Sequence, residues 1–212
     1  MKYKDHDKQN AAAALEERIL ECAQSYPLPK QALKVAVDVG ANIGGFSVHA
    51  AQSFQKIVAI EANPDSVECL KNNLKERNIN NVEVHALAVS DIKGKMINLY
   101  KIDEGDAAHS GNCGTEWDKN PSYKILETEE VPTTDLDEVF SLCGESYIDY
   151  LKVDCEGAEY NFLMDKALKN VGYIVGEYHP GIVSDLDGLW NHIRKTHRLQ
   201  ISPNHLFFAV PL

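Results

Sequence analysis

Residues 35–49 read Val-Ala-Val-Asp-Val-Gly-Ala-Asn-Ile-Gly-Gly-Phe-Ser-Val-His. The apolar run at the start is typical of a buried strand, and the glycines after it indicate a tight turn that leads into a helix. A strand, a glycine turn and a helix in this order are typical of α/β sheets that bind nucleotide-like ligands beyond the carboxyl ends of their strands. This stretch therefore predicts both the fold class and the position of a ligand site.

An acidic residue in this turn indicates which ligand it suits. A dinucleotide site has the spacing G-x-G-x-x-G and faces a pyrophosphate, whereas this chain has Asp38-x-Gly40-x-Asn42-x-Gly44. Asp38 would repel an anion and attract a cation. S-adenosylmethionine carries a sulfonium and an ammonium group and no phosphate, so we expect it as the cofactor. We expect Asp38, Gly40, Asn42 and Gly44 to bind it, although a tight turn needs glycine whatever it binds.

Strands and helices alternate along the rest of the chain. Strands are expected at 35–39, 57–61, 82–89, 96–100, 148–154, 173–177, 198–202 and 205–210. Helices are expected at 11–25, 42–54, from Pro64 onward, at 135–142 with Thr134 as the cap, at 158–168 and at 185–196. The alternation predicts an α/β fold, a Rossmann-like three-layer αβα sandwich with a mostly parallel sheet. The last two strands predict a hairpin that adds an antiparallel strand at the C-terminus.

The length of 212 residues predicts one main domain, with a helical extension at 1–30 and the α/β domain at 31–212. Residues 101–130 are rich in glycine and polar side chains, and they include His109, Cys113 and Trp117. This segment is expected to be a long loop, either a lid over the substrate or simply an exposed loop.

The composition excludes several classes of protein. The chain has no apolar run long enough for a membrane span, and its polar N-terminus lacks the apolar core of a signal peptide. The five cysteines are scattered and form no C-x-x-C pair, which argues against a disulfide framework or a zinc site and favours a cytoplasmic location. The net charge of −11 makes nucleic acid an unfavourable partner.

Two residues at strand ends suit the adenosine part of the expected cofactor. Glu61 ends the second strand, where a carboxylate can accept hydrogen bonds from ribose hydroxyls, as it also does in NAD enzymes. Ala88 ends the third strand and is expected to line an adenine pocket.

The fourth and fifth strands end in residues suited to proton transfer. Asp154 and Glu156 follow the fourth strand, and Asp154 is also expected to contact the cofactor. His179 follows the fifth strand, with Glu177 expected to orient it. Crowded carboxylates raise one another's proton affinity, so Asp154, Glu156 and His179 are the candidates for removing a substrate proton. The same acids and His179 could instead hold a divalent cation, but no compact metal motif supports this, and we expect no metal.

Five motifs occur in an order that resembles the FkbM-type family of S-adenosylmethionine-dependent methyltransferases. They are Val-Asp-Val-Gly-Ala-Asn-Ile-Gly (37–44), Ile-Glu-Ala-Asn-Pro (60–64), Ala-Val-Ser-Asp (88–91) with Gly94, Val-Pro-Thr-Thr-Asp-Leu-Asp-Glu (131–138) and Leu-Lys-Val-Asp-Cys-Glu-Gly-Ala-Glu (151–159). The resemblance spans about residues 34–181 and implies the seven-stranded class I methyltransferase fold, with strand order 3-2-1-4-5-7-6.

The resemblance also implies a reaction and assigns residues to it. It implies O-methylation, in a family whose members act on sugars and polyketide-like small molecules. The cofactor role would fall on Asp38, Gly40, Asn42 and Glu61, and the site after the fourth strand on Asp154 and Glu156. The expected partner is thus a small molecule with a hydroxyl acceptor, and the sequence leaves a homodimer open. The alternatives are an NAD-dependent oxidoreductase on a related sheet and a binding module without catalysis.

Overall fold

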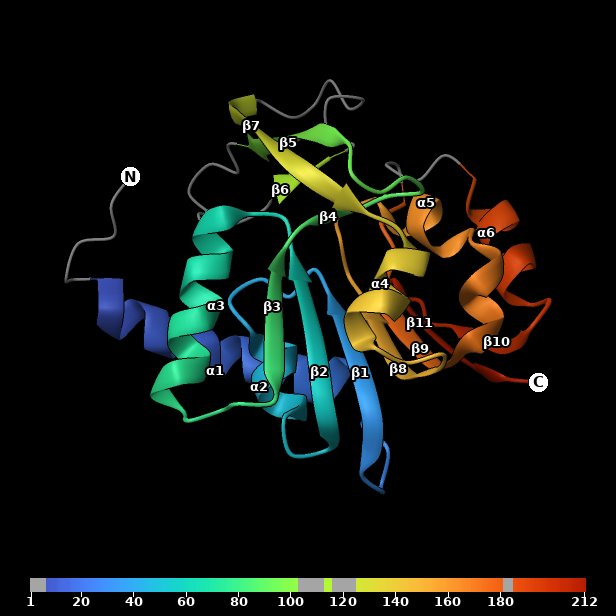
Figure 1. The fold of residues 1–212 in the computed structure, drawn as a ribbon, viewed down its shortest axis with the longest axis horizontal. Coiled ribbons are helices and arrows are strands. Elements are labelled where there is room, and N and C mark those ends of the chain that lie inside the picture. Colours follow the sequence, from blue (N-terminus) through green and yellow to red (C-terminus); the bar gives the residue numbers. More distant parts are fainter. Residues whose placement is uncertain (1–6, 103–112, 116–124, 181–184) are drawn as a thin grey trace.

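The computed structural model describes residues 7–102, 113–115, 125–180 and 185–212. Its main sheet has seven strands in the order β10-β11-β9-β8-β1-β2-β3 (Figure 1). These strands are β1 (Leu33–Val39), β2 (Phe54–Glu61), β3 (Val82–Ala86), β8 (Ile148–Val153), β9 (Val171–Glu177), β10 (His197–Ile201) and β11 (Leu206–Pro211). Read from β3, this is the expected order 3-2-1-4-5-7-6, with β11 antiparallel to β9 and β10.

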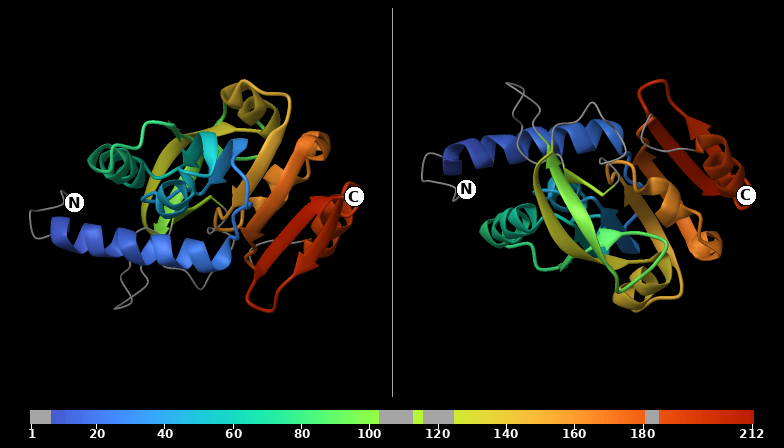
Figure 2. Two further views of the ribbon diagram at one scale, coloured as in Figure 1. Left: turned by 90° about the horizontal axis from the view of Figure 1, so that it is seen from below. Right: turned by 90° about the horizontal axis from the view of Figure 1, so that it is seen from above.

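Helices cover both faces of the sheet, which confirms the three-layer sandwich. One face carries α1 (Asp7–Ser25), α2 (Gly45–Ala50) and α3 (Pro64–Glu76); the other carries α4 (Leu136–Cys143), α5 (Glu159–Leu163), the 3₁₀ helix η3 (Lys166–Asn170) and α6 (Leu186–Ile193). In Figure 2, α1 and α4 lie on opposite sides of the sheet. Along β1, Val37 packs toward α4 and α6 while the neighbouring Ala36 packs toward Phe46 of α2. A parallel strand buried on both faces is apolar at successive positions, as this one is.

A second, smaller sheet was not expected from the sequence. It contains β4 (Ala88–Val89), β5 (Met96–Ile102), β6 (Cys113–Gly114) and β7 (Ile125–Thr134), in the order β4-β7-β5-β6. It lies across the carboxyl ends of β1, β2 and β3 (Figure 1). The expectation of a loop over 101–130 is therefore wrong at both ends, and His109 and Trp117 lie outside the described residues.

Local side-chain chemistry sets several element boundaries differently from the expected ones. The expected strand at 82–89 is divided, because β4 leaves the main sheet and pairs with β7. The helix expected at 158–168 is divided by Asp165, whose side chain accepts a hydrogen bond from Ala167 N (2.7 Å) and caps η3. Asp135, not Thr134, caps α4 by accepting from Glu138 N (2.8 Å). The side chain of Asn63 caps α3 by accepting a hydrogen bond from Asp65 N (3.1 Å).

None of the helices in the described residues is both long and apolar enough to cross a membrane. Cys22, Cys69, Cys143 and Cys155 are free thiols.

Candidate active site

A cavity of about 460 Å³ opens at the carboxyl ends of the main-sheet strands. Its lining comes from the turn after β1, the end of β2, the second sheet, the segments after β8 and β9, and the last turns of α1. This is the place where open α/β sheets bind their ligands, and the volume suits a ligand of cofactor size.

The turn after β1 passes very close to the segment after β8. Gly40 has φ +68°, and a Cβ atom built on it would lie 1.6 Å from the carbonyl oxygen of Asp154. Only glycine therefore fits this position. Gly40 and Asn42 line the cavity, as expected, whereas Gly44 does not; it stands at φ +100° at the start of α2.

Glu61 lines the cavity and also anchors the backbone around it. Its Oε2 accepts a hydrogen bond from Asn42 N and its Oε1 accepts one from Asn63 N, both at 2.8 Å. Burial raises the pKa of Glu61, while these backbone hydrogen bonds act in the opposite direction. Each carboxylate oxygen can accept a further bond, so the expected contact with ribose hydroxyls stays a prediction that the geometry allows.

Asp38 lies behind the turn and is fully buried. Its Oδ2 accepts from Ser47 Oγ (2.7 Å), and its Oδ1 lies 3.2 Å from Lys152 Nζ. Asp38 is not among the residues that line the cavity, so a direct contact with a ligand, as expected from the sequence, does not fit its position. Through Lys152, Asp38 instead supports the turn after β1.

Lys152, in β8, is the buried cation that the sequence analysis did not assign to the site. Its Nζ donates to the carbonyl oxygens of Val39 (3.1 Å) and Gly40 (2.8 Å), and so it ties the turn to β8. Burial disfavours its charge, but Asp38 and Asp154 outweigh this effect and hold the pKa of Lys152 above its ordinary value. A lysine within the largely apolar run Tyr150–Val153 was the signal available in the sequence.

The side of the cavity where adenine is expected is apolar. Ala88 lines it as expected, together with Ile60, Leu87 and Val89. Leu99, from β5 of the second sheet, completes this wall and was not anticipated.

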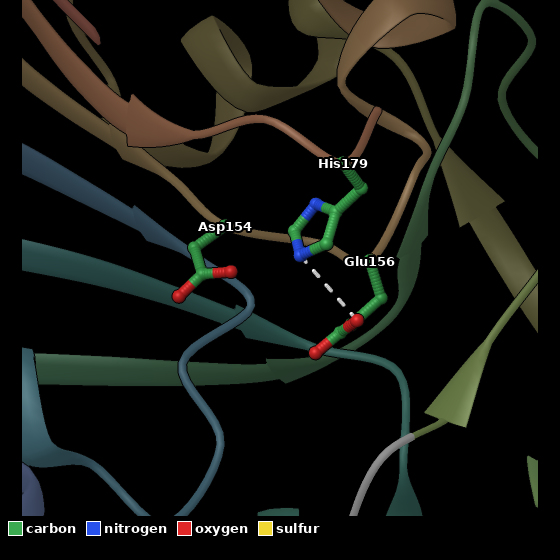
Figure 3. A group of neighbouring side chains, drawn as sticks. All are labelled: Asp154, Glu156 and His179. Atoms are coloured by element: carbon green, nitrogen blue, oxygen red, sulfur yellow. Dashed lines mark ion pairs between the residues drawn. The ribbon is translucent and has the colours of Figure 1, made fainter. Parts of the chain in front are cut away.

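On the opposite side, Asp154, Glu156 and His179 converge from the segments after β8 and β9 (Figure 3). His179 Nε2 lies 3.4 Å from Glu156 Oε2. His179 Nδ1 lies 3.0 Å from Oε1 of Glu159, a fully buried residue of α5. Glu159, and not Glu177 as expected, therefore orients His179; Glu177 lines the same cavity.

These neighbours perturb the acid–base properties of the cluster. Burial raises the pKa of Glu156 to about 7, with His179 lowering it and the nearby carboxylates adding to the rise. Burial alone would lower the pKa of His179, but the hydrogen bond to Glu159 and the charges of Glu159, Glu156 and Asp154 raise it to about 9. With no other cation present, His179 Nε2 thus retains its proton at neutral pH.

The end of α1 forms one wall of the cavity, which the sequence analysis also missed. Arg18 and Cys22 line it, and Tyr26, just after the helix, donates from its hydroxyl to Asp154 Oδ2 (3.2 Å). Burial raises the pKa of Cys22 to about 12, so this thiol is unreactive as a nucleophile.

The charges that line the cavity favour a cationic ligand. The acidic lining residues are Glu21, Glu61, Asp154, Glu156 and Glu177, and the basic ones among the described residues are Arg18, Lys152 and His179. Lys152 is already held by two carbonyl oxygens, and His179 by Glu159. A sulfonium and an ammonium group fit these carboxylates, whereas a pyrophosphate would be repelled by them.

The family model described as "Methyltransferase FkbM domain" matches residues 38–199. A solved FkbM methyltransferase from Methylobacillus flagellatus shares the fold, with a TM-score of 0.59 and 16% identity over 94% of this chain and 58% of that one.

Two curated proteins are also similar. A probable cobalt-precorrin-6B C(15)-methyltransferase from Methanobrevibacter smithii is 30% identical over 52% of this chain. The tRNA (guanine(37)-N(1))-methyltransferase Trm5b of Methanocaldococcus jannaschii is 31% identical over 44% of this chain. The matched regions span only 62% and 32% of the lengths of these two relatives.

Proposed function

Because this chain belongs to the FkbM methyltransferase family and its cofactor is S-adenosylmethionine, we propose that it methylates a hydroxyl oxygen of a small molecule, such as a sugar or a polyketide-type metabolite. The observation that carries this proposal is the cavity itself. The Gly40 turn and Glu61 lie on one side of the cavity, and Asp154, Glu156 and His179 lie on the other. Cofactor and acceptor can therefore meet in one cavity.

When bound, S-adenosylmethionine supplies a methyl group that its sulfonium has already activated. The protein must then orient the acceptor oxygen in line with the methyl carbon, exclude water and promote loss of the hydroxyl proton. The backbone from Gly40 to Asn42, held by Glu61, would position the cofactor. Asp154, Glu156 and His179 would hold the acceptor hydroxyl and promote loss of its proton.

The charge of the cavity supports a small, uncharged acceptor. Five carboxylates and three basic side chains line it, so a phosphate backbone would meet net repulsion there. The two curated relatives are named for methylation at a carbon and at a guanine nitrogen. Choosing oxygen here rests on the family resemblance and on a cluster of carboxylates and histidine that suits a hydroxyl group.

The first test is calorimetric titration of the protein with S-adenosylmethionine, S-adenosylhomocysteine and NAD. We expect the two sulfur compounds to bind and NAD not to bind. The second test measures S-adenosylhomocysteine production with a panel of sugars, polyketide-type alcohols and tRNA. Turnover with a hydroxyl compound supports the proposal; turnover with tRNA alone, or product methylated at carbon or nitrogen, would contradict it.

A further inference from the structure

The cluster of Asp154, Glu156 and His179 has the geometry of a set of metal ligands. Each side chain offers one ligand atom, and these atoms all lie within 4.8 Å of one another (Figure 3). Metal bonds of about 2.1 Å, at angles between those of octahedral and tetrahedral sites, place neighbouring ligand atoms about 3.0–3.4 Å apart. His179 Nε2 and Glu156 Oε2 are already 3.4 Å apart. Rotation of the partly exposed carboxylates would shorten the remaining separations.

A second, independent feature lies behind the cluster. Glu159 is fully buried, and its Oε1 accepts from His179 Nδ1 and from the backbone N–H groups of Cys155 (3.0 Å) and Gly157 (3.3 Å). Its Oε2 is buried and has no hydrogen-bond partner among the described residues. A buried carboxylate on the far nitrogen of a histidine is the usual support of a metal-binding imidazole, because it fixes the ring and directs the other nitrogen at the cation.

We propose that Asp154, Glu156 and His179 bind a divalent transition-metal cation such as Mn²⁺, and that this cation holds the acceptor through two neighbouring oxygen atoms. One imidazole and two carboxylates match the ligand preferences of such ions. Three protein ligands leave coordination positions open, as in catalytic metal sites. The acceptor part of this inference rests on the proposed function and narrows it to molecules with vicinal oxygens, such as a sugar diol.

The cation also changes how the acceptor proton is lost. A hydroxyl group bound to a divalent cation has a lowered pKa, so its proton passes to water. The oxygen–methyl bond then forms while the carbon–sulfur bond breaks, and the electron pair of that bond stays on sulfur. Asp154, Glu156 and His179 would act through the cation in place of accepting the proton themselves.

Titration of the purified, chelator-treated protein with Mn²⁺, followed by the electron paramagnetic resonance signal of the free ion, tests the site. We expect one Mn²⁺ per chain, bound more tightly than about 0.1 mM. Asp154→Asn, Glu156→Gln and His179→Gln should each weaken binding by at least about 10-fold. Glu177→Gln is the matched control, because it removes one carboxylate from the same cavity but not from the cluster; its affinity should change by less than about threefold.

Circular dichroism and thermal unfolding show that each variant is folded. Absence of Mn²⁺ binding in the unsubstituted protein, or binding that survives both Glu156→Gln and His179→Gln, would overturn the inference. The proposed function is rejected by a different result. Mn²⁺ binding without methyl transfer to any hydroxyl compound would leave the site standing and reject the function, whereas full transfer after chelation would reject only the role of the cation in holding the acceptor.

Discussion

The charged side chain of Lys152 is buried, and its hydrogen bonds to the carbonyl oxygens of Val39 and Gly40 hold the Gly40 turn in place. Replacing Lys152 with Met would leave Asp38 fully buried and without its cation, and breaking a buried pair in this way costs about 3–5 kcal/mol. We expect the free energy of unfolding in urea to fall by this amount. The matched control is Lys93→Met, which removes an exposed ion pair with Glu138 and should leave stability near that of the unsubstituted protein.

The double variant Asp38→Asn, Lys152→Met completes the test, since it removes both charges together. It should be more stable than Lys152→Met alone. Equal stability of the two variants would mean that the pair is not the reason for the loss.

Comparing substitutions at Gly40 and Gly94 distinguishes the effect of close packing from the effect of backbone strain. Both have positive φ, +68° and +73°, but a Cβ atom on Gly94 would meet nothing within 4 Å. Gly94→Ala should cost only the left-handed strain, about 1–2 kcal/mol. Gly40→Ala should cost more and should also abolish binding of S-adenosylmethionine, because the turn must move away from the Asp154 carbonyl oxygen. Calorimetric titration and urea unfolding of both variants measure this; retained cofactor affinity in Gly40→Ala would contradict it.

His179 should matter for turnover and not for cofactor affinity. His179→Ala is expected to lower the methyl-transfer rate by at least about 100-fold. The dissociation constant of S-adenosylmethionine should stay within about twofold, because His179 is not among the expected cofactor contacts. His192→Ala is the control: the Nε2 atom of His192 hydrogen-bonds the carbonyl oxygen of Asp165, and this side chain does not line the cavity. Unchanged turnover in His179→Ala would remove this residue from the mechanism.

At the scale of elements, β5 brings the second sheet into the cofactor site. Leu99 is fully enclosed and lines the cavity, whereas Met96 on the same strand is exposed. Leu99→Ala should lower stability by about 2–5 kcal/mol and weaken binding of S-adenosylmethionine, since it opens a hole in the apolar wall. Met96→Ala should change neither quantity. Thermal unfolding and calorimetry of the two variants would compare them; equal effects would show that β5 is only peripheral.

Elements of the main sheet were predictable because their burial imposes a local apolar pattern. The runs at Val35–Val39 and Ile148–Val153 consist mainly of apolar residues that are buried on both faces of the sheet, and Pro64 after Asn63 marks the start of a helix. The second sheet carries no such pattern. β7 begins Ile-Leu-Glu-Thr-Glu-Glu, mostly exposed, and is a strand only because β5 pairs with it. Long-range pairing of this kind leaves no trace in a local window.

The same distinction applies to the site. Residues at strand ends, such as Asp154 and His179, were predictable because a parallel sheet brings its carboxyl ends to one edge. Their partners were not. The choice of Glu159 over Glu177 as the partner of His179 depends on how α5 packs, and the contribution of Tyr26 depends on where α1 crosses the sheet. Such contacts join segments far apart in the chain.

At the scale of the whole molecule, the net charge of −11 should favour the cationic form of the cofactor. S-adenosylmethionine carries one positive charge more than S-adenosylhomocysteine. Raising the salt concentration shortens the Debye length, to about 8 Å at physiological ionic strength, and screens that extra attraction. Calorimetry at low and high NaCl should therefore show the affinity for S-adenosylmethionine falling more than that for S-adenosylhomocysteine. An equal loss for both ligands would mean that the protein's field does not reach the site.

The close approach of Gly40 to the Asp154 carbonyl oxygen has a consequence for how such proteins can be recombined. The Gly40 turn and Glu61 come from the first half of the chain, and Asp154, Glu156 and His179 from the second half, so each half could in principle be exchanged to combine a cofactor with a new acceptor. The two halves meet here in a backbone-to-backbone contact that has no room for a side chain. A chimera can form this contact only if its first half has glycine at position 40 and its second half has the same backbone path after β8.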